Sequence, residues 1–365
     1  MGMAHDEQWC RWIYGELPKF RTVDSAVESY QRKAAADRAK AAEAAEAKRD
    51  APPGLDDVIG NADSVQQIRT ALLAHRARLA RARDGAPPAF PHMILSGPGG
   101  TGKTLLSEII AREIKHPIRL QMGQSLTGPA RVGDVLLSLA ENDVLFIDEM
   151  HGLKSACQET LYRAMEDGVF VPILKSGKQV MEPVPLPPFT LIGSTTDEWA
   201  LLQSLLQRFK YRIRLERMTA EELSQAIVQR AKRRGWDLTD DAARMIAGRS
   251  HGTPRIAIGL LDGCMDMALS GDSTAIDELI VDATCREWGI DELGLNKVDR
   301  KYLGFLAEAG GKPVRLNVLA TRLDGLSRRT VEMRVEPDLV WIGLVEKAAD
   351  GRRLTEAGRE YVKKR

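Results

Sequence analysis

One segment of the chain has residue types and a spacing suited to holding a phosphate group. It is GPGGTGKT, residues 97–104, which matches G-x-x-x-x-G-K-[ST] between an apolar MILS run and an amphipathic LLSEIIAREI stretch. Glycines let backbone N–H groups curl around a phosphate, a lysine neutralises its charge, and a threonine hydroxyl coordinates Mg²⁺. The segment therefore predicts a nucleotide-binding loop, formed by Gly97, Gly99, Gly100, Thr101, Gly102, Lys103 and Thr104.

Two carboxylates follow a second apolar run. VLFIDE, residues 144–149, places Asp148 and Glu149 after a stretch where charge is costly unless it serves a cation or a catalytic water. Downstream of a phosphate loop, this pattern predicts that Asp148 holds Mg²⁺ through its water shell and that Glu149 polarises the attacking water. A third run, FTLIGSTT, ends in hydroxyls beside the same sheet edge, and Thr196 is expected to orient that water.

These motifs lie in a region where short apolar runs alternate with helical patterns. Residues 93–97, 144–148 and 189–196 have strand length, and the alternation predicts a parallel sheet covered by helices. After about residue 217 helical patterns take over, with Thr219, Thr239 and Thr253 expected as N-caps. From about residue 297, helices precede two short strand-like pieces that flank a basic turn. The predicted domains are a helical arm and linker (1–53), an ATPase domain (54–217), a helical lid (218–296) and a C-terminal domain (297–365).

Composition and charge limit the function classes. The 365 residues are 44% hydrophobic, enough for two or three cores, and the chain has neither a signal-peptide core nor an apolar run of the roughly 20 residues that span a bilayer. A cytoplasmic protein without membrane association is expected. Cys10, Cys157, Cys264 and Cys285 form no CxxC pair, which predicts buried thiols rather than a disulfide or zinc framework.

The C-terminal section is basic. Residues 297–365 carry 16 Lys and Arg against 10 Asp and Glu, within a chain whose net charge is +1. Such an excess indicates either a surface that attracts polyanions or an ordinary solvated basic face. Charge alone leaves both interpretations open.

In their order along the chain, these motifs resemble those of AAA+ ATPases. More narrowly, LFIDEMH, LYRAMEDG, LPPFTLIGSTT, LLQRF and HGTPRIA resemble the bacterial RuvB family of Holliday-junction branch-migration motors, from about Leu55 to the C-terminus. The resemblance implies an α/β fold: an AAA+ P-loop ATPase domain with a parallel sheet, a small helical lid domain and a C-terminal winged helix. It also implies ATP and Mg²⁺ as cofactors.

The same resemblance assigns roles to residues outside the phosphate loop. Arg208 would be a finger that reaches the nucleotide of a neighbouring subunit, and Arg255 a second sensor that contacts the γ-phosphate of its own subunit. Hydrolysis would then need a ring, by family analogy a hexamer. The remaining implied positions are Val58, Ile59 and Met218 around the adenine base and Arg352 on the DNA backbone.

The implied function is an ATP-dependent motor on double-stranded or branched DNA, driving branch migration in recombination and repair. A hairpin at 169–188 would dock an RuvA-like junction-binding partner, although Glu182, Pro183 and Pro185 count against docking to a standard RuvA. Leu206 and Asp197 stand where the family usually has arginines. Two other interpretations stay open: an AAA+ factor that remodels proteins, and an ATP-gated DNA-binding subunit with little turnover.

Overall fold

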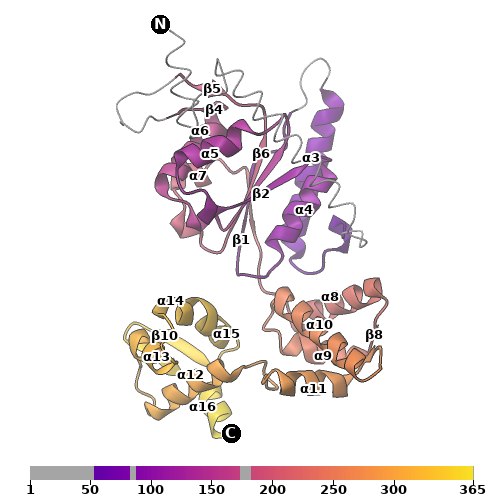
Figure 1. Cartoon of the computed structure of the whole chain (residues 1–365), viewed down its shortest axis with the longest axis vertical. Helices are drawn as coiled ribbons and strands as arrows, with labels where there is room; N and C mark the ends of the chain where they lie inside the picture. Colours follow the sequence, from indigo (N-terminus) through magenta and orange to yellow (C-terminus); the bar gives the residue numbers. More distant parts are fainter. Residues whose placement is uncertain (1–52, 83–87, 173–181, 365) are drawn as a thin grey trace. The chain divides into compact units, whose positions relative to one another are not determined.

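The computed structural model describes residues 53–82, 88–172 and 182–364 (Figure 1). The chain divides into two compact units between Glu216 and Arg217. Residues 1–52 of the predicted N-terminal arm, with Cys10, lie outside the described residues.

A five-stranded sheet forms the centre of the first unit. Its strand order is β2-β3-β6-β1-β7, and all four neighbouring pairs are parallel. The predicted parallel sheet is therefore confirmed, and the three apolar runs are three of its adjacent strands. Because the strands are parallel, their carboxyl ends meet at one edge. The strands are β1 (Met93–Ser96), β2 (Ile118–Met122), β3 (Val144–Asp148), β6 (Thr190–Thr195) and β7 (Tyr211–Arg214).

Helices cover both faces of this sheet because alternate residues of each strand point to opposite sides. In β3, Val144 and Phe146 pack in one core with α3 (Ala62–Arg81) and α4 (Lys103–Glu113). Leu145 and Ile147 pack in the other core. The helices of that second face are α5 (Pro129–Leu137), α6 (Ser155–Asp167) and α7 (Gln203–Leu206).

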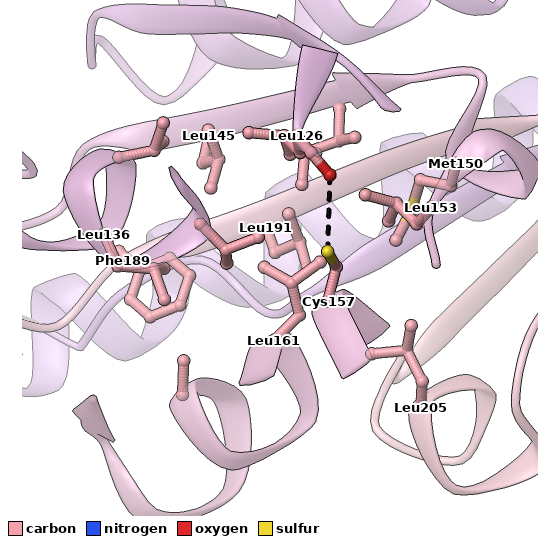
Figure 2. Packing of buried hydrophobic residues seen from close by; sticks show 14 of the residues in the cluster. Leu126, Leu136, Leu145, Met150, Leu153, Cys157, Leu161, Phe189, Leu191 and Leu205 are labelled. Atoms are coloured by element: carbon pink, nitrogen blue, oxygen red, sulfur yellow. Dashed lines mark hydrogen bonds between the residues drawn. The ribbon is translucent and has the colours of Figure 1, made fainter. Parts of the chain in front are cut away.

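Figure 2 shows this second core. Leu161 of α6 lies beside Leu191 of β6, and Leu205 of α7 belongs to the same buried cluster, which ties the two helices to the sheet. The Cys157 thiol donates to the Leu126 carbonyl at 3.3 Å, and burial raises the pKa of this thiol. The predicted buried thiols are thus confirmed for Cys157, as they are for the two cysteines of the second unit.

Short elements complete the first unit. The 3₁₀ turns are η1 (Leu55–Asp57), η2 (Gly123–Ser125), η3 (Met150–Gly152) and η4 (Glu198–Ala200). Strands β4 (Val169–Phe170) and β5 (Val184–Pro185) pair antiparallel, and Pro185 stands opposite Val169. Proline therefore lies within this two-residue ladder and does not interrupt it there. Residues 173–181 of the predicted docking hairpin lie outside the described part of the chain.

The second unit begins with the helical lid. It contains α8 (Ala220–Arg234), α9 (Asp240–Gly248), α10 (Pro254–Ser270) and α11 (Glu278–Glu287), with a parallel pair of two-residue strands, β8 (Asp237–Leu238) and β9 (Ala275–Ile276). The hydroxyls of Thr219 and Thr239 cap α8 and α9 as predicted. Thr253 is the N-cap of α10 as predicted, although its hydroxyl makes no capping hydrogen bond. Its backbone carbonyl instead accepts the Ile256 N–H at 3.0 Å, and Pro254 has no N–H to offer.

A winged-helix domain follows the lid. Its helical elements are α12 (Lys297–Glu308), α13 (Leu316–Arg322), α14 (Arg328–Thr330), the π-helical η5 (Val331–Val335), α15 (Glu336–Trp341) and α16 (Glu356–Lys363). The wing is the antiparallel hairpin β10 (Val345–Ala348) and β11 (Gly351–Leu354). The predicted basic turn is wrong in detail, because the turn is Ala349 and Asp350 and the arginines belong to β11.

Charged contacts join the lid to the winged helix within the second unit. Arg217 places Nη2 2.7 Å from Asp338 Oδ1 and lies over the Trp341 ring at 5.3 Å, while its Nη1 donates to the His251 carbonyl at 2.7 Å. Burial lowers the pKa of His251, but hydrogen bonds to Asp338 and the Leu293 carbonyl outweigh burial and raise it above its usual range. The Asp338 carboxylate thus contacts two residues, Arg217 before the first lid helix and His251 in the loop before α10.

A buried helical glycine gives a test of the second core of the first unit. A Cβ on Gly133 of α5 would lie 2.1 Å from the Phe170 ring, so Gly133→Ala should destabilise the protein by about 1–3 kcal/mol through overpacking, despite the better helix propensity of alanine. Gly259→Ala in α10 is the matched control, because nothing lies within 4 Å of its Cβ, and it should stabilise by up to about 1 kcal/mol. Thermal unfolding measures both. An unchanged melting temperature for Gly133→Ala would contradict this packing.

Candidate active site

The glycine-rich loop joins β1 to α4. Gly97 and Gly102 have φ values of 134° and 99°, which residues with a side chain rarely adopt. A Cβ on Gly97 would lie 2.1 Å from the Leu215 carbonyl oxygen, so glycine lets the loop pack beside the end of β7. On Gly99 and Gly102 a Cβ would meet nothing within 4 Å. The loop is therefore packed on one side and open on the other.

Lys103 begins α4 and closes the loop. Its side chain is buried, and Nζ donates to the carbonyls of Gly97 at 2.9 Å and Pro98 at 2.8 Å. The Thr101 hydroxyl donates to the same Pro98 carbonyl at 2.9 Å. A buried ammonium at a helix N-terminus, inside an open glycine loop, fits the charge and size of a phosphate group.

The Asp148 carboxylate lies at the end of β3, opposite this loop. Its Oδ2 accepts from the Thr104 hydroxyl at 3.4 Å, and its Oδ1 accepts from the Ser194 hydroxyl and from the Glu149 N–H at 3.0 Å. Ser194 is fully buried in β6 and was not predicted as a site residue. Carboxylate and hydroxyl oxygens are the ligands that Mg²⁺ prefers, so Thr104 and Asp148 fit such an ion.

Glu149 adopts a left-handed backbone conformation, with φ 53° and ψ 51°. A non-glycine residue in this region costs of order 1–3 kcal/mol, and such residues cluster at functional sites. The turn brings Glu149 Oε2 to 3.1 Å from His151 Nδ1 and 3.5 Å from the Thr196 hydroxyl. The structure therefore unites Glu149 with the predicted Thr196, and adds His151.

His151 was missed because no metal or nucleophile motif surrounds it. Its Nδ1 also lies 3.4 Å from the Thr195 hydroxyl and 3.5 Å from that of Thr196. The signal that could have found it is its place two residues after Glu149, since the tight turn η3 returns the chain toward the carboxylate.

Arg208 lies apart from this cluster. Its Nε is 2.7 Å from Glu166 Oε2, and its Nη2 donates to the Tyr162 hydroxyl at 3.3 Å. Among the described residues, no contact joins Arg208 to the phosphate loop or to Glu149. Leu206, which stands where an arginine was expected, is buried in the core of the second sheet face.

The residues predicted to hold the base and to sense the γ-phosphate are divided between the units. Val58 and Ile59 follow η1 in the first unit, and both are half-buried. Met218 and Arg255 belong to the second unit, where Met218 is buried and Arg255, in the first turn of α10, is exposed. The Met218 N–H donates to the Gly252 carbonyl at 2.9 Å, which fixes it beside the start of α10.

Arg352, predicted to contact DNA, is paired inside the winged helix. Its Nε donates at 2.8 Å to Glu336, which is fully buried and also accepts from the Tyr302 hydroxyl at 3.0 Å and pairs with Lys347 at 2.8 Å. Burial raises the pKa of Glu336, but these donors outweigh it and hold the pKa below its usual range. Arg353, next along β11, is half-exposed and pairs with Glu346 on the neighbouring strand.

A parallel sheet with a phosphate loop and acidic strand end, followed by a helical lid and a winged helix, defines an AAA+ P-loop ATPase. Residues 51–215 match the family described as Holliday junction DNA helicase RuvB P-loop domain, residues 218–291 the RuvB AAA lid domain, and residues 292–363 the RuvB C-terminal winged helix domain. The chain belongs to the RuvB family.

Individual relatives agree with this membership. Proteins named Holliday junction branch migration complex subunit RuvB, from Paramagnetospirillum magneticum and Helicobacter pylori, are each 36% identical over 313 residues, covering 85% and 86% of this chain and 88% and 90% of their own lengths. The solved structure of the Thermotoga maritima RuvB Holliday junction branch migration motor is 35% identical, with a TM-score of 0.73 over 86% of this chain and 98% of that one. In the part of the chain that the structure describes, no helix is long and apolar enough to cross a membrane.

The contact between His151 and Glu149 yields a test of the site. With its proton on Nδ1, the ring donates to the carboxylate and holds it in place, so His151→Ala should lower kcat for ATP hydrolysis about tenfold, the equivalent of roughly 1.4 kcal/mol. His151→Asn, which keeps a donor, should recover most of that loss. Steady-state turnover at saturating ATP is the measurement, and equal kcat in all three proteins would refute the assignment.

Proposed function

We propose that this protein is an ATP-driven, ring-forming motor that moves duplex DNA and drives branch migration of four-way junctions. The observation that carries the proposal is the cluster of Lys103, Thr104, Asp148 and Glu149 at one sheet edge, in a chain that ends in a basic winged helix. Its relatives named as branch migration complex subunits support the same activity.

Each residue of the cluster has a distinct task in this proposal. Lys103 neutralises phosphate charge, and Thr104 with Asp148 holds Mg²⁺. Glu149 accepts a proton from the attacking water, and Thr196, 3.5 Å from its carboxylate, orients that water. ATP with Mg²⁺, when bound, supplies the phosphoanhydride bond whose hydrolysis drives movement. Val58, Ile59 and Met218 are proposed to hold the base, and Arg255 to sense the γ-phosphate.

Arg208 is proposed to act on the nucleotide of a neighbouring subunit. The contacts of its side chain within the first unit are to α6, and none reaches its own phosphate loop among the described residues. A guanidinium matches phosphate oxygens and stabilises transition-state charge, an effect worth about 10³–10⁵ in rate in other phosphoryl-transfer enzymes. Turnover would then need a closed ring, which we propose to be a hexamer.

The winged helix is proposed to bind the DNA backbone through its wing. Arg352 keeps 16% of its side chain exposed beside the half-exposed Arg353, and both lie on β11. Phosphate contacts from such arginines supply affinity without sequence preference.

An RuvA-like protein is the proposed junction-binding partner, consistent with relatives named as subunits of a complex.

The trans role of Arg208 predicts a dependence on assembly. Specific ATPase activity of the wild type should rise with protein concentration and with a synthetic four-way junction, whereas Arg208→Ala should lose turnover by about 10³-fold or more at every concentration. The matched control is Arg244→Ala, which removes an exposed lid arginine paired with Asp241 and should behave as wild type. Turnover that ignores junction DNA and Arg208 would instead favour a protein-remodelling factor.

The wing arginines predict two separable effects. Arg352→Ala leaves the buried Glu336 with fewer partners and should destabilise the winged helix by about 1–3 kcal/mol, measured by thermal unfolding. Arg353→Ala should leave stability unchanged, weaken junction binding, and reduce the slope of log affinity against log salt by about 1. Binding by Arg353→Ala that equals the wild type at every salt concentration would remove Arg353 from the DNA surface.

A further inference from the structure

The backbone around Arg208 is held rigidly by its neighbours. Leu205, Leu206 and Phe209 are all buried in the core of the second sheet face. The Arg208 N–H donates to the Leu205 carbonyl at 3.0 Å, which continues the turn of α7. Only the direction of the Arg208 side chain is therefore left for other groups to decide.

Two residues of α6 decide that direction. Tyr162 and Glu166 are four positions apart, so they share one face of the helix. The Glu166 carboxylate lies 2.7 Å from Arg208 Nε, the Tyr162 hydroxyl accepts from Nη2 at 3.3 Å, and the guanidinium lies over the Tyr162 ring, 5.1 Å from its centroid. The hydrogen bond to Tyr162, followed by the charge of Glu166, raises the pKa of Arg208. A carboxylate on one edge and an aromatic face below fix the plane of the guanidinium.

This arrangement leaves part of the guanidinium available. Nη2 donates one hydrogen bond, to Tyr162, and Nε lies beside the Glu166 carboxylate without a hydrogen bond to it, while no contact to Nη1 is found among the described residues. The Arg208 side chain is 35% exposed and that of Glu166 40%, so the cluster reaches the surface of the unit. A guanidinium that is 35% exposed keeps N–H groups for a phosphate of another subunit.

We propose that Glu166 and Tyr162 are positioning residues that orient Arg208 toward the nucleotide of the neighbouring subunit. The proposal rests on the trans role of Arg208 given above and adds the residues that aim it. Orientation matters because the guanidinium acts on charge that develops only in the transition state, and a small misplacement lowers the rate sharply. A solvent-exposed ion pair contributes little to stability. The role we assign to the pair of Glu166 and Arg208 is therefore to orient the guanidinium.

Kinetics of point variants separate positioning from folding. Glu166→Gln should lower kcat of the assembled protein about tenfold, with KM for ATP and the melting temperature unchanged, because the substituted residue makes no contact with its own subunit's phosphate loop. Tyr162→Phe keeps the ring and should lose only a few-fold, whereas Tyr162→Leu should lose as much as Glu166→Gln. Glu159→Gln, an exposed acid on α6 without a described contact to Arg208, is the matched control and should match the wild type.

A mixing experiment shows in which subunit the defect acts. Glu149→Gln subunits have a disabled site but an intact Arg208, so adding them to Glu166→Gln should restore turnover at the intact sites of the latter. The same addition to Arg208→Ala tests the trans role itself. If Arg208→Ala is restored but Glu166→Gln already turns over like the wild type, the positioning proposal fails while the trans finger stands.

Three further results of these experiments would overturn or support the positioning role of Glu166. If adding Glu149→Gln restores neither variant, Arg208 does not act in trans, and the proposal falls with the function on which it rests. If Glu166→Gln lowers the melting temperature and raises KM together, its role is structural and positioning is overturned. Restoration of both variants by the same partner supports it.

Discussion

Three neighbouring parallel strands, β3, β6 and β1, end at one edge of the central sheet, and the candidate active site is placed from that edge. The parallel ladder brings Asp148 at the end of β3 beside Ser194 in β6, and the loop after β1 carries Lys103 and Thr104 to the same edge. Hydrophobic packing on both faces of the sheet keeps the ladder in register, since a shift by one residue would turn each strand's core side chains toward the wrong face. The positions of the site residues therefore depend on the order and register of the sheet.

The carboxylates of Asp148 and Glu149 lie next to an apolar core and therefore need hydrogen-bond partners. These partners fix the positions of the two side chains. Asp148 is satisfied by two hydroxyls and a backbone N–H, and Glu149 leaves the strand direction through a left-handed conformation that points it toward His151 and Thr196. The winged helix contains a buried carboxylate, and there the partners include charged side chains. Its buried Glu336 is neutralised by Arg352 and Lys347, so charges that look from the sequence like a DNA-binding surface also hold the domain together.

Two of the arginines predicted to have functional roles, Arg208 and Arg352, are both held by glutamates, but in different surroundings. Glu336 is fully buried, so its pairing with Arg352 is structural, because an unpaired carboxylate there would be costly. Glu166 is 40% exposed, so its pairing with Arg208 is screened by solvent, contributes little to stability and instead sets a direction. The difference in burial between the two glutamates thus distinguishes the roles of the two arginines. Arg352 supports the fold, whereas Arg208 is oriented for a neighbouring subunit.

The sequence by itself determined the features that depend on local spacing. The glycines and lysine of the phosphate loop, the apolar runs of β1, β3 and β6, and the threonine caps of α8 and α9 are written within a few consecutive residues, so pattern alone predicts them. Only the tertiary structure decided contacts between distant residues: Ser194 with Asp148, Glu166 with Arg208, and Glu336 with Arg352. At Thr253 the sequence predicted the position of the cap but not the atom that accepts, because the carbonyl of Thr253, and not its hydroxyl, accepts the Ile256 N–H. The physical reason is that residue types specify local backbone geometry, whereas the order and register of packed elements specify which side chains meet.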